Sequence, residues 1–280
     1  MPRQLSPLAP FSTTIERAMP SKPKLGQNFL HDPQAIQRIA AALGDCADCT
    51  VVEIGPGRGA LTRALVARVG HLIAVELDPE LAAGIRAEFP ADRVTVVQQD
   101  VLQFNFAAAA SSGNRLAIVG NLPYYITSPI LHTLAANHAV IDRTILMMQR
   151  EVADRVAAEP GSRDYGLLSV TVQLYGPAQK LFTLPPAAFS PPPDVHSTVV
   201  RWRMAPRFAD LHVDEKTFVP FLRQAFAQKR KTLANNLRAA GYEPAVITRA
   251  FTAASVDPLA RAEALPVAEL AAISDSLASL

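Results

Sequence analysis

The sequence predicts an α/β fold: a doubly wound, Rossmann-like sheet followed by a small all-helical C-terminal domain. Short apolar runs alternate with single helical segments between positions 50 and 148, which is typical of parallel strands joined by right-handed crossovers. A glycine-rich turn opens the helical segment that follows the first of these strands. After Pro206 the apolar residues recur at helical spacing, which indicates a second architecture.

The predicted elements of the sheet domain follow a regular order. Residues 1–20 are rich in Pro, Ser and Thr without periodicity, and we expect a flexible arm there. Asp32 and Pro33 predict the N-cap and the first residue of a helix. Strands are then expected over 50–54, 71–77, 93–99, 116–119 and 143–148, and helices over 59–68, 79–89 and 129–137.

Two more strands and the helical domain complete the chain. Residues 180–184 and 197–204 are predicted to be an edge pair that closes the same sheet. The sequence leaves open whether these strands pair antiparallel. Phe218, Leu222 and Phe226 lie at helical spacing in the segment beyond. The predicted units are an arm at 1–20, a sheet domain at 21–205 and a helical domain at 206–280.

The composition indicates a globular protein and argues against a membrane-spanning or secreted one. The chain has 280 residues, of which 49% are hydrophobic and 19% charged, so it can bury a full core. Its apolar runs fall short of the roughly 20 residues of a membrane span, and its N-terminus lacks the apolar block of a signal peptide. We therefore expect a cytoplasmic protein without a membrane partner, and a monomer.

Charge is unevenly distributed along the chain. The formal net charge is only +2, but residues 201–238 hold nine basic and three acidic side chains, a net of +6. Within this segment the basic residues Arg223, Lys229, Arg230, Lys231 and Arg238 cluster around a helical pattern. Such a cluster is typical of a phosphate-binding surface, although a solvated helix face is an equally ordinary explanation.

The cysteines and histidines give weaker signals. Cys46 and Cys49 form a single C-x-x-C that precedes a strand, whereas a thioredoxin-type pair follows one, and we expect two reduced thiols. The six histidines show no metal-ligand spacing with carboxylates or thiols, so we expect no metal.

Asn121-Leu122-Pro123-Tyr124 carries the strongest chemical signal. It follows an apolar strand, and the carboxyl end of such a strand faces the ligand crevice of a doubly wound sheet. The Asn121 side-chain oxygen and the Leu122 carbonyl can accept hydrogen bonds from one exocyclic amine while Tyr124 stacks on its ring. Asn121 is no base, so the pattern favours attack on an activated electrophile. The alternative is an Asx turn at Asn121 with Tyr124 in the core.

Three other groups predict an adenosine-containing ligand beside this segment. Gly55 and Gly57 make a tight turn after the first strand, and Glu76 ends the second strand 21 residues after Gly55, where a carboxylate can accept ribose hydroxyls. Asp100 ends the third strand and can accept an adenine amine, or cap a turn. S-adenosylmethionine fits better than NAD, because the turn lacks a pyrophosphate cradle and a sulfonium is an activated electrophile.

These residues as a set resemble the RNA adenine N6-dimethyltransferases, in particular the bacterial small-subunit (16S) ribosomal RNA type. The similar stretches run from about residue 24 to residue 203 and include 24–30, 53–62, 76–78, 99–102, 121–124, 148–153 and 189–197. The resemblance implies that Asn28 and Leu30 contact the methionine end of the cofactor, and that Phe189 and Tyr124 sandwich the target base. Without it, Asn28 reads as a helix-entry turn and Phe189 as a core residue.

The resemblance implies dimethylation of N6 in two adjacent adenosines near the 3′ end of 16S ribosomal RNA within the small subunit. S-adenosylmethionine would be the cofactor, and the basic cluster would bind structured RNA. Asp194 departs from the pattern, because a basic residue is frequent there. The alternatives are a methyltransferase of large-subunit (23S) RNA, a non-catalytic RNA-binding assembly or transcription factor on the same fold, and a dehydrogenase, for which the sequence offers no hydride-transfer site.

Overall fold

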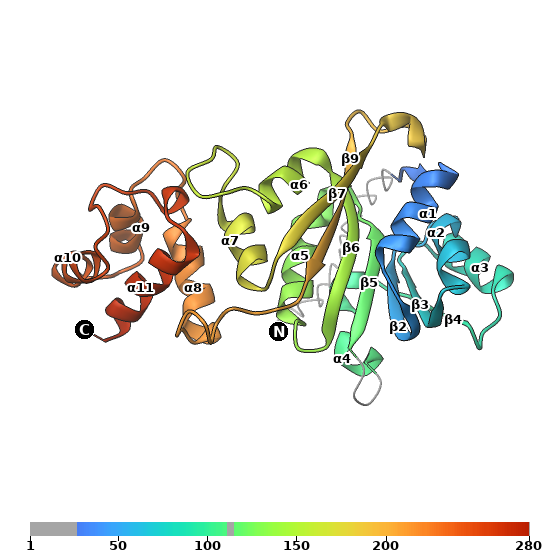
Figure 1. Ribbon diagram of the computed structural model, residues 1–280, viewed down its shortest axis with the longest axis horizontal. Helices are drawn as coiled ribbons and strands as arrows, with labels where there is room; N and C mark the ends of the chain where they lie inside the picture. The colour runs from blue at the N-terminus through green and yellow to red at the C-terminus, as the bar shows by residue number, and fades with distance from the viewer. Residues whose placement is uncertain (1–26, 111–114, 280) are drawn as a thin grey trace, which may run out of the picture.

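A seven-stranded mixed sheet forms the body of the molecule, and helices cover both of its faces (Figure 1). The computed structural model describes residues 27–110 and 115–279, so the arm predicted at 1–20 lies outside the described residues. The strand order is β4-β3-β2-β5-β6-β9-β7. The strands span Cys46–Ile54 (β2), Val69–Glu76 (β3), Val94–Gln98 (β4), Leu116–Asn121 (β5), Ile141–Gln149 (β6), Ala178–Leu184 (β7) and Ser197–Arg203 (β9).

The pairing confirms the predicted fold class. Strands β4, β3, β2, β5 and β6 run parallel, whereas β9 is antiparallel to both β6 and β7. The order reverses beside β2, where β3 and β5 lie on opposite sides of the first strand of the sheet. This arrangement opens a crevice at the carboxyl ends of β2 and β5.

Two hydrophobic cores lie on the two faces of the sheet. Helices α1 (Pro33–Ala42), α2 (Ala60–Val66) and α3 (Pro79–Glu88) supply Ile39, Leu65 and Ile85 to one core. Helices α5 (Thr127–Ala136) and α7 (Leu167–Leu174) supply Leu131 and Val170 to the other. Successive strand residues point to opposite faces, so Val51 and Val52 of β2 join different cores.

Helix starts follow the capping chemistry of the sequence. Asp32 caps α1 as predicted, because its side chain accepts hydrogen bonds from the N–H groups of Gln34 and Ala35, and Pro33 occupies the first helical position. Asp78 caps α3 in the same way ahead of a proline.

Several short elements were not predicted. They are the helices α4 (Phe106–Ala109), α6 (Arg150–Val156) and α7, the two-stranded pairing of β1 (Phe29–Leu30) with β8 (Phe189–Ser190), and the 3₁₀ turns η1 (Val101–Gln103), η2 (Tyr124–Ile126) and η3 (Pro186–Ala188). Helix α7 contains the β-branched residues Val170, Thr171 and Val172, which have low helix propensity, but burial on nearly every side lets it pack as a helix.

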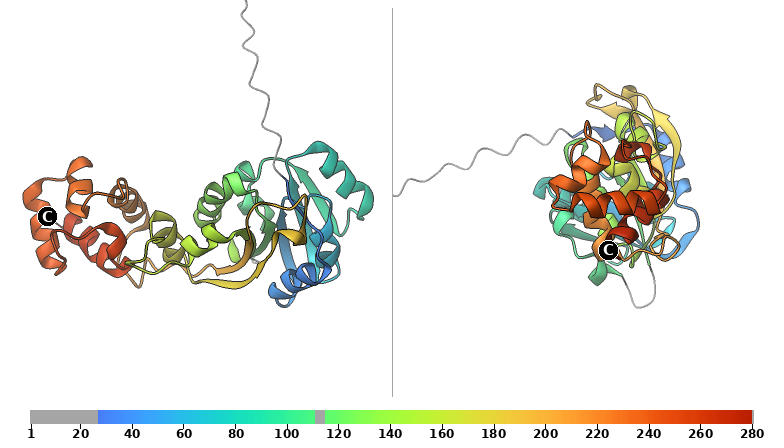
Figure 2. Two further views of the ribbon diagram at one scale, coloured as in Figure 1. Left: turned by 90° about the horizontal axis from the view of Figure 1, so that it is seen from above. Right: turned by 90° about the vertical axis from the view of Figure 1, so that its left-hand side faces the viewer.

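The C-terminal helices gather at one end of an elongated molecule, well separated from β2 and β4 (Figure 2). They are α8 (Glu215–Ala225), α9 (Leu233–Ala239), α10 (Pro244–Ala253) and α11 (Val267–Ala278), with the 3₁₀ turn η4 (Ala262–Ala264). The core that contains α5 and α7 continues into these helices through Phe218 and Phe221. The Trp202 ring of β9 lies in this core, and its indole N–H donates to the Val172 carbonyl at 3.1 Å.

The expectation of two reduced thiols was wrong. Cys46 and Cys49 form a disulfide within the first residues of β2, with their Cα atoms 4.7 Å apart. The register of β2 shifts between Cys46 and Thr50, and this irregularity brings the two cysteines together. The position of a C-x-x-C before a strand therefore does not prevent its closure.

Candidate functional site

A pocket lies where the carboxyl ends of four parallel strands meet. Residues that follow or end β2, β3, β4 and β5 line it together with the segment around β1, and they include most residues predicted for the cofactor and the target base. The lining contains Asn28, Leu30, Gly55, Gly57, Glu76, Asp100, Asn121, Leu122 and Tyr124. The topology therefore gathers residues that are 93 positions apart in the chain, as Asn28 and Asn121 are.

Asn121 ends β5 with its amide held in one orientation. Its Nδ2 donates a hydrogen bond to the backbone carbonyl of Asn28 at 3.0 Å. Because that carbonyl can only accept, the amide must turn its oxygen the other way. Asn121 Oδ1 is buried and has no hydrogen-bond partner among the described residues. A buried acceptor without a donor is costly, so this oxygen indicates a donor group on a ligand.

The next residues fix the floor of the pocket. The Leu122 N–H donates to the Met147 carbonyl of β6 at 2.9 Å, and its side chain is buried. Tyr124 lies half-buried at the pocket wall, where its hydroxyl shares a hydrogen bond of 2.8 Å with Ser197 Oγ. Burial raises the pKa of the Tyr124 hydroxyl, so the ring stays neutral. Tyr124 therefore presents a fixed aromatic surface to the pocket.

Acidic residues occupy the part of the pocket formed by β3 and β4. Glu76 accepts hydrogen bonds from the backbone N–H groups of Gly57 at 3.1 Å and of Asp78 at 3.0 Å, one on each carboxylate oxygen. Asp100 caps η1 through one oxygen, which accepts from the Leu102 N–H at 2.9 Å. A carboxylate oxygen can accept more than one hydrogen bond. Both side chains thus retain acceptor capacity toward the pocket.

The glycine turn brings backbone close to these carboxylates. Gly55 and Gly57 have φ values of +64° and +57°, a conformation that favours glycine. A Cβ on Gly57 would lie 3.0 Å from the Phe29 ring. That ring also carries the Arg58 guanidinium 4.3 Å from its centroid. The turn and the β1 segment therefore pack as one unit over the pocket.

Glu53 is a pocket residue that sequence reasoning did not single out. It lies near the end of β2, is 2% exposed, and accepts a hydrogen bond from the Thr62 hydroxyl at 2.8 Å. Burial raises the pKa of its carboxyl to about 7, the Thr62 bond opposes the rise, and the negative charge of Glu76 adds to it. Buried acids with a raised pKa cluster at functional sites. Sequence reasoning missed Glu53 because the sequence does not show directly that this residue is buried.

The resemblance implies that Phe189 stacks on the target base, and the structure places this residue beside the pocket lining rather than in it. Its ring is 2% exposed and packs in the core on the α1 side, outside the lining of the pocket. The cause is the pairing of β8 with β1, in which Phe189 lies opposite Leu30. The exposed ring at the pocket is instead that of Tyr125, which is 59% exposed. Burial, Asp100 and Glu76 raise the pKa of its hydroxyl.

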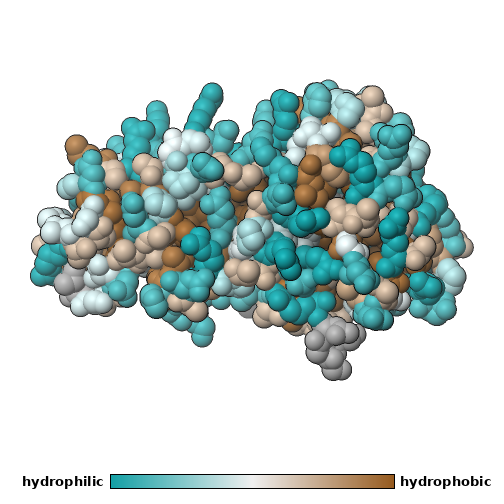
Figure 3. All heavy atoms as spheres, in the orientation of Figure 1, coloured by the Kyte–Doolittle hydropathy of each residue, from teal (hydrophilic) through white to brown (hydrophobic). Residues whose placement is uncertain are grey.

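The predicted RNA-binding residues lie apart from the pocket lining. Arg223 lies in the last turn of α8 and Arg238 in the last turn of α9, and the connection between the two helices contains Lys229, Arg230 and Lys231. All five are exposed, and Lys229 Nζ donates to the Arg163 carbonyl at 2.8 Å. Hydrophilic side chains project from the upper edge of this end of the molecule in Figure 3.

No group of three or more potential metal ligands occurs among the described residues, and none of the helices in that part of the chain has the length and hydropathy needed to cross a bilayer.

The donor set of the pocket fits S-adenosylmethionine. Glu76 and Asp100 offer acceptors for hydroxyl and amine groups, and Glu53 offers a buried carboxylate for a positive charge. Asn121 Oδ1 adds an acceptor that has no donor within residues 27–110 and 115–279. Such a pocket can hold an amine and a cation side by side without a general base, which is what transfer from a sulfonium requires.

Comparison with known proteins agrees with this chemistry. The family described as ribosomal RNA adenine dimethylase matches residues 19–279. A ribosomal RNA small subunit methyltransferase A of Acidobacterium capsulatum is 57% identical over 253 residues, which cover 90% of this chain and 89% of the relative. The protein of the same name from Koribacter versatilis is 47% identical and covers 91% of this chain and 94% of its own length.

Solved structures share the fold. The crystal structure of the 23S rRNA methyltransferase ErmE has a TM-score of 0.67 and 25% identity, and the match covers 90% of this chain and 100% of that one. A dimethyladenosine transferase from Plasmodium falciparum has a TM-score of 0.70 over 88% of this chain and 95% of its own, at 21% identity. With the family match over nearly the whole chain, the protein belongs to the ribosomal RNA adenine dimethylase family.

Proposed function

We propose that the protein transfers methyl groups from S-adenosylmethionine to N6 of two adjacent adenosines in the 3′-terminal hairpin region of 16S ribosomal RNA, during assembly of the small subunit. The observation that carries the proposal is the buried, unpaired Oδ1 of Asn121 in a pocket rich in acceptors. Close relatives named as small-subunit methyltransferases support the choice of RNA. We further propose that the enzyme acts as a monomer in the cytoplasm, where ribosomes assemble.

The carboxylates and the β1 segment would hold the cofactor. Glu76 would accept the ribose hydroxyls and Asp100 the adenine amine, while Gly55 and Gly57 let the backbone approach closely. Asn28 and Leu30 would contact the methionine end. When bound, S-adenosylmethionine supplies a methyl group on a positively charged sulfur. The Glu53 carboxylate would face that positive charge from within the pocket, and its own proton would then leave more easily.

Asn121 and Leu122 would hold the target amine. An adenine N6 donates two N–H groups, and Asn121 Oδ1 and the Leu122 carbonyl are two neutral acceptors that can take them. Their pull on the hydrogens favours a pyramidal nitrogen, whose lone pair is then free to attack. Neither acceptor takes up a proton at neutral pH, so the pocket works by orientation and by exclusion of water.

The second methyl transfer requires a change in the hydrogen bonds to Asn121 Oδ1 and the Leu122 carbonyl. A singly methylated N6 has one N–H, so one of the two acceptors must release its bond before the second transfer. The Leu122 carbonyl is a main-chain group, and the peptide that precedes it is tied to β6 through the bond of the Leu122 N–H to the Met147 carbonyl. Asn121 is a side chain and can adjust, but only if its bond to the Asn28 carbonyl changes.

Aromatic and basic residues would engage the RNA. Tyr124 would stack on a base swung out of the RNA, and Tyr125 has an exposed ring at the same pocket for a neighbouring group. The exposed cluster on α8, α9 and their connection would bind phosphates without reading sequence. Its members are Arg223, Lys229, Arg230, Lys231 and Arg238.

A methyltransferase of 23S RNA is the second candidate, because ErmE has a similar structure over its whole length. The experiment is transfer of labelled methyl groups to unmethylated 30S subunits, 50S subunits and naked 16S RNA, followed by mapping of the modified sites. We expect N6,N6-dimethyladenosine at two adjacent positions of 16S RNA in the 30S sample. Preferential labelling of 50S or 23S material would support the second candidate, and RNA binding without any transfer would support a non-catalytic factor.

A further inference from the structure

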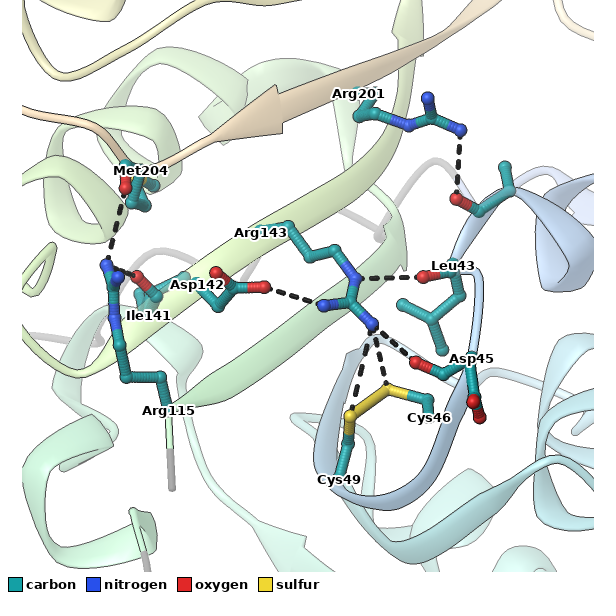
Figure 4. Close-up of polar contacts among 11 residues, drawn as sticks. Leu43, Asp45, Cys46, Cys49, Arg115, Ile141, Asp142, Arg143, Arg201 and Met204 are labelled. Carbon is teal, nitrogen blue, oxygen red and sulfur yellow. Dashed lines mark hydrogen bonds and ion pairs between the residues drawn. A yellow bond between two sulfur atoms is a disulfide. The ribbon is translucent and has the colours of Figure 1, made fainter. Parts of the chain in front are cut away.

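The end of the sheet opposite the pocket holds a disulfide that the methyl-transfer chemistry does not use (Figure 4). Cys46 begins β2, whose other end leads to the glycine turn at Gly55. At about 3.3 Å per residue, the five-residue step from Cys49 to Ile54 separates the disulfide from the pocket end of β2 by roughly 17 Å. Neither cysteine lines the pocket. The pair is thus a separate chemical group of the chain.

Arg143 of β6 is fixed against this disulfide by three oxygen partners. Its Nε donates to the Leu43 carbonyl at 2.8 Å, its Nη2 to the Asp45 carbonyl at 2.8 Å, and its Nη1 to the Asp142 carboxylate at 2.6 Å. Figure 4 shows the guanidinium pointing into the turn that precedes β2. Because these bonds hold the plane of the guanidinium, its position does not depend on the sulfur atoms.

The same guanidinium reaches both sulfurs. Nη2 of Arg143 lies 3.4 Å from Cys46 Sγ and 3.9 Å from Cys49 Sγ. A disulfide sulfur is a weak acceptor, whereas a thiolate beside a guanidinium gains a charge-assisted hydrogen bond. The arrangement therefore favours the reduced, ionised form of the nearer sulfur. The other charged groups around the turn are the carboxylates of Asp45, Asp48 and Asp142 and the guanidinium of Arg201, which donates to the Ala42 carbonyl at 3.2 Å.

Exposure distinguishes the two cysteines. Cys46 is 2% exposed, whereas Cys49 is partly exposed and follows the exposed residues Ala47 and Asp48 of β2. An external thiol therefore reaches the Cys49 sulfur first. The closed loop contains only four residues, so the bond removes little loop entropy from the unfolded chain and is poorly suited to a stabilising role.

We propose that Cys46 and Cys49 are a redox-active pair that exchanges electrons with dithiols, with Arg143 stabilising the Cys46 thiolate. In reduction, a thiolate of the dithiol attacks Cys49 Sγ, the Cys46–Cys49 bond breaks, and Cys46 leaves as the thiolate beside Arg143. The second thiol of the dithiol loses its proton and attacks its own sulfur in the mixed disulfide, which releases Cys49. The protein gains two electrons and the dithiol becomes a cyclic disulfide. Of the two protons that the dithiol loses, one passes through water to Cys49 and the other goes to solvent, because Cys46 stays a thiolate.

The test uses the full-length protein and dithiothreitol as the dithiol. The oxidised fraction is measured by alkylation and mass spectrometry across a series of reduced-to-oxidised dithiothreitol ratios, with circular dichroism to verify folding. We expect a reversible two-electron titration in the folded protein. A bond that resists excess dithiothreitol until the protein unfolds, or thiols that never close under oxidised dithiothreitol, would overturn the proposal.

The role of Arg143 has its own readout. Thiolate absorbance at 240 nm of the reduced protein should titrate with a midpoint below the value of about 8.5 for free cysteine. Arg143→Gln should raise that midpoint and lower the thiolate fraction at pH 7 at least about threefold, whereas Arg201→Gln, which removes a carbonyl contact of the same kind, should leave it in place. An unchanged midpoint in folded Arg143→Gln would contradict the assignment.

If Arg143→Gln does not fold, a pair of cysteine variants tests the role of Arg143 instead. Cys49→Ser leaves only the Cys46 thiol, and Cys46→Ser leaves only the Cys49 thiol. We expect the lower thiolate midpoint in Cys49→Ser, because Cys46 is nearer to Arg143. Equal midpoints, or the reverse order, would rule out the proposed role. Both variants should retain methyl transfer, so this test stands apart from that of the proposed function.

Discussion

The two ends of the parallel sheet differ in how their polar groups are satisfied. At the amino ends, Arg115, Arg143 and Arg201 donate to backbone carbonyls of neighbouring segments, and Figure 4 shows these contacts. At the carboxyl ends, Glu53 is buried and accepts a hydrogen bond from Thr62, and Asn121 Oδ1 has no partner among the described residues. Thr144 Oγ1 of β6, next to Arg143, is also buried without a described partner, but it does not line the pocket, whereas Asn121 and Glu53 do.

This difference gives a physical criterion for the site. Buried polar groups in a folded protein are nearly always paired, so an unpaired acceptor and a carboxyl with a raised pKa at the same pocket have a cost that folding alone does not explain. Substitutions at the two ends should accordingly have opposite consequences. At the carboxyl ends they should impair function and spare or raise stability, whereas at the amino ends they should lower stability and spare function.

The largest effect is expected at Asn121. Asn121→Ala removes the unpaired acceptor and should lower kcat for methyl transfer by about 100- to 1000-fold, the loss typical of one oriented hydrogen bond in a transition state. Cofactor affinity, measured by calorimetry, should change little. Asn137→Ala is the matched control, because Asn137 caps α5 through a bond to the Thr133 carbonyl and does not line the pocket. Near-normal turnover of Asn121→Ala would remove the basis of the proposed chemistry.

Glu53→Gln should raise stability in a pH-dependent way. The carboxyl loses its proton near pH 4.5 in the unfolded chain but near pH 7 in the folded one. Wild-type stability is therefore lost as pH rises from 4.5 to 7, and above pH 7 the penalty reaches about 3 kcal/mol. The variant carries no such charge, so its free energy of unfolding should exceed that of the wild type at pH 8.

The stability difference between Glu53→Gln and the wild type should vanish near pH 4.5. Denaturant titrations at the two pH values measure it, and equal stability at pH 8 would show that the carboxylate carries no penalty. The same variant should bind S-adenosylmethionine more weakly at pH 8, because it cannot offer a negative charge to the sulfonium. A gain in stability with a loss in affinity is the pattern expected only at the ligand end of the sheet.

Gly70→Ala tests the packing at the amino ends of the parallel strands. A Cβ on Gly70, in β3, would lie 2.6 Å from the Ala47 carbonyl oxygen in the disulfide turn. We expect a loss of about 1–3 kcal/mol in the free energy of unfolding, as for other overpacked sites, with unchanged cofactor affinity. Gly84→Ala in α3 has open space around the added methyl and should stabilise the protein by about 0.5–1 kcal/mol. Tight packing of the turn would be disproved by similar stability changes in the two variants.

The smallest effects are expected in the basic cluster. Arg230→Ala and Lys231→Ala remove exposed charges from the connection between α8 and α9. Each phosphate contact that is lost should lower the slope of log affinity against log salt concentration by about 0.7–0.9 and leave kcat unchanged. Lys216→Ala, on the first turn of α8, is a charge-matched control. RNA affinity with an unaltered salt dependence in both cluster variants would place the RNA-binding surface elsewhere.

The sequence predicts the sheet well because its signals are local. Apolar runs, the Asp32-Pro33 cap and the glycine turn each specify an element within a few residues, and parallel topology then brings the strand ends together. Asn121, Glu76 and Asp100 could be placed for that reason. Helix α7 could not, because its β-branched residues favour a strand until the surrounding core is known.

The missed features depend on packing between distant segments. Phe189 is buried because β8 pairs with β1 about 160 positions earlier, and a lone phenylalanine in a proline-rich loop gives no sign of that pairing. The raised pKa of Glu53 results from complete burial, which a single acidic residue at a strand end does not reveal. The disulfide depends on an irregularity in the pairing of β2 with β3, which the C-x-x-C spacing leaves open.

The bond from Asn121 Nδ2 to the Asn28 carbonyl decides which end of the Asn121 amide, the acceptor oxygen or the donor nitrogen, faces the pocket. An amide has an acceptor at one side and a donor at the other, and a half-turn about its last torsion exchanges them. If the segment around β1 withdrew, nothing in that bond would hold the oxygen outward, and the amide could meet an incoming amine with its own hydrogens. The position of the segment around β1, which has no reactive group, would then determine whether Asn121 presents an acceptor or a donor to the substrate amine.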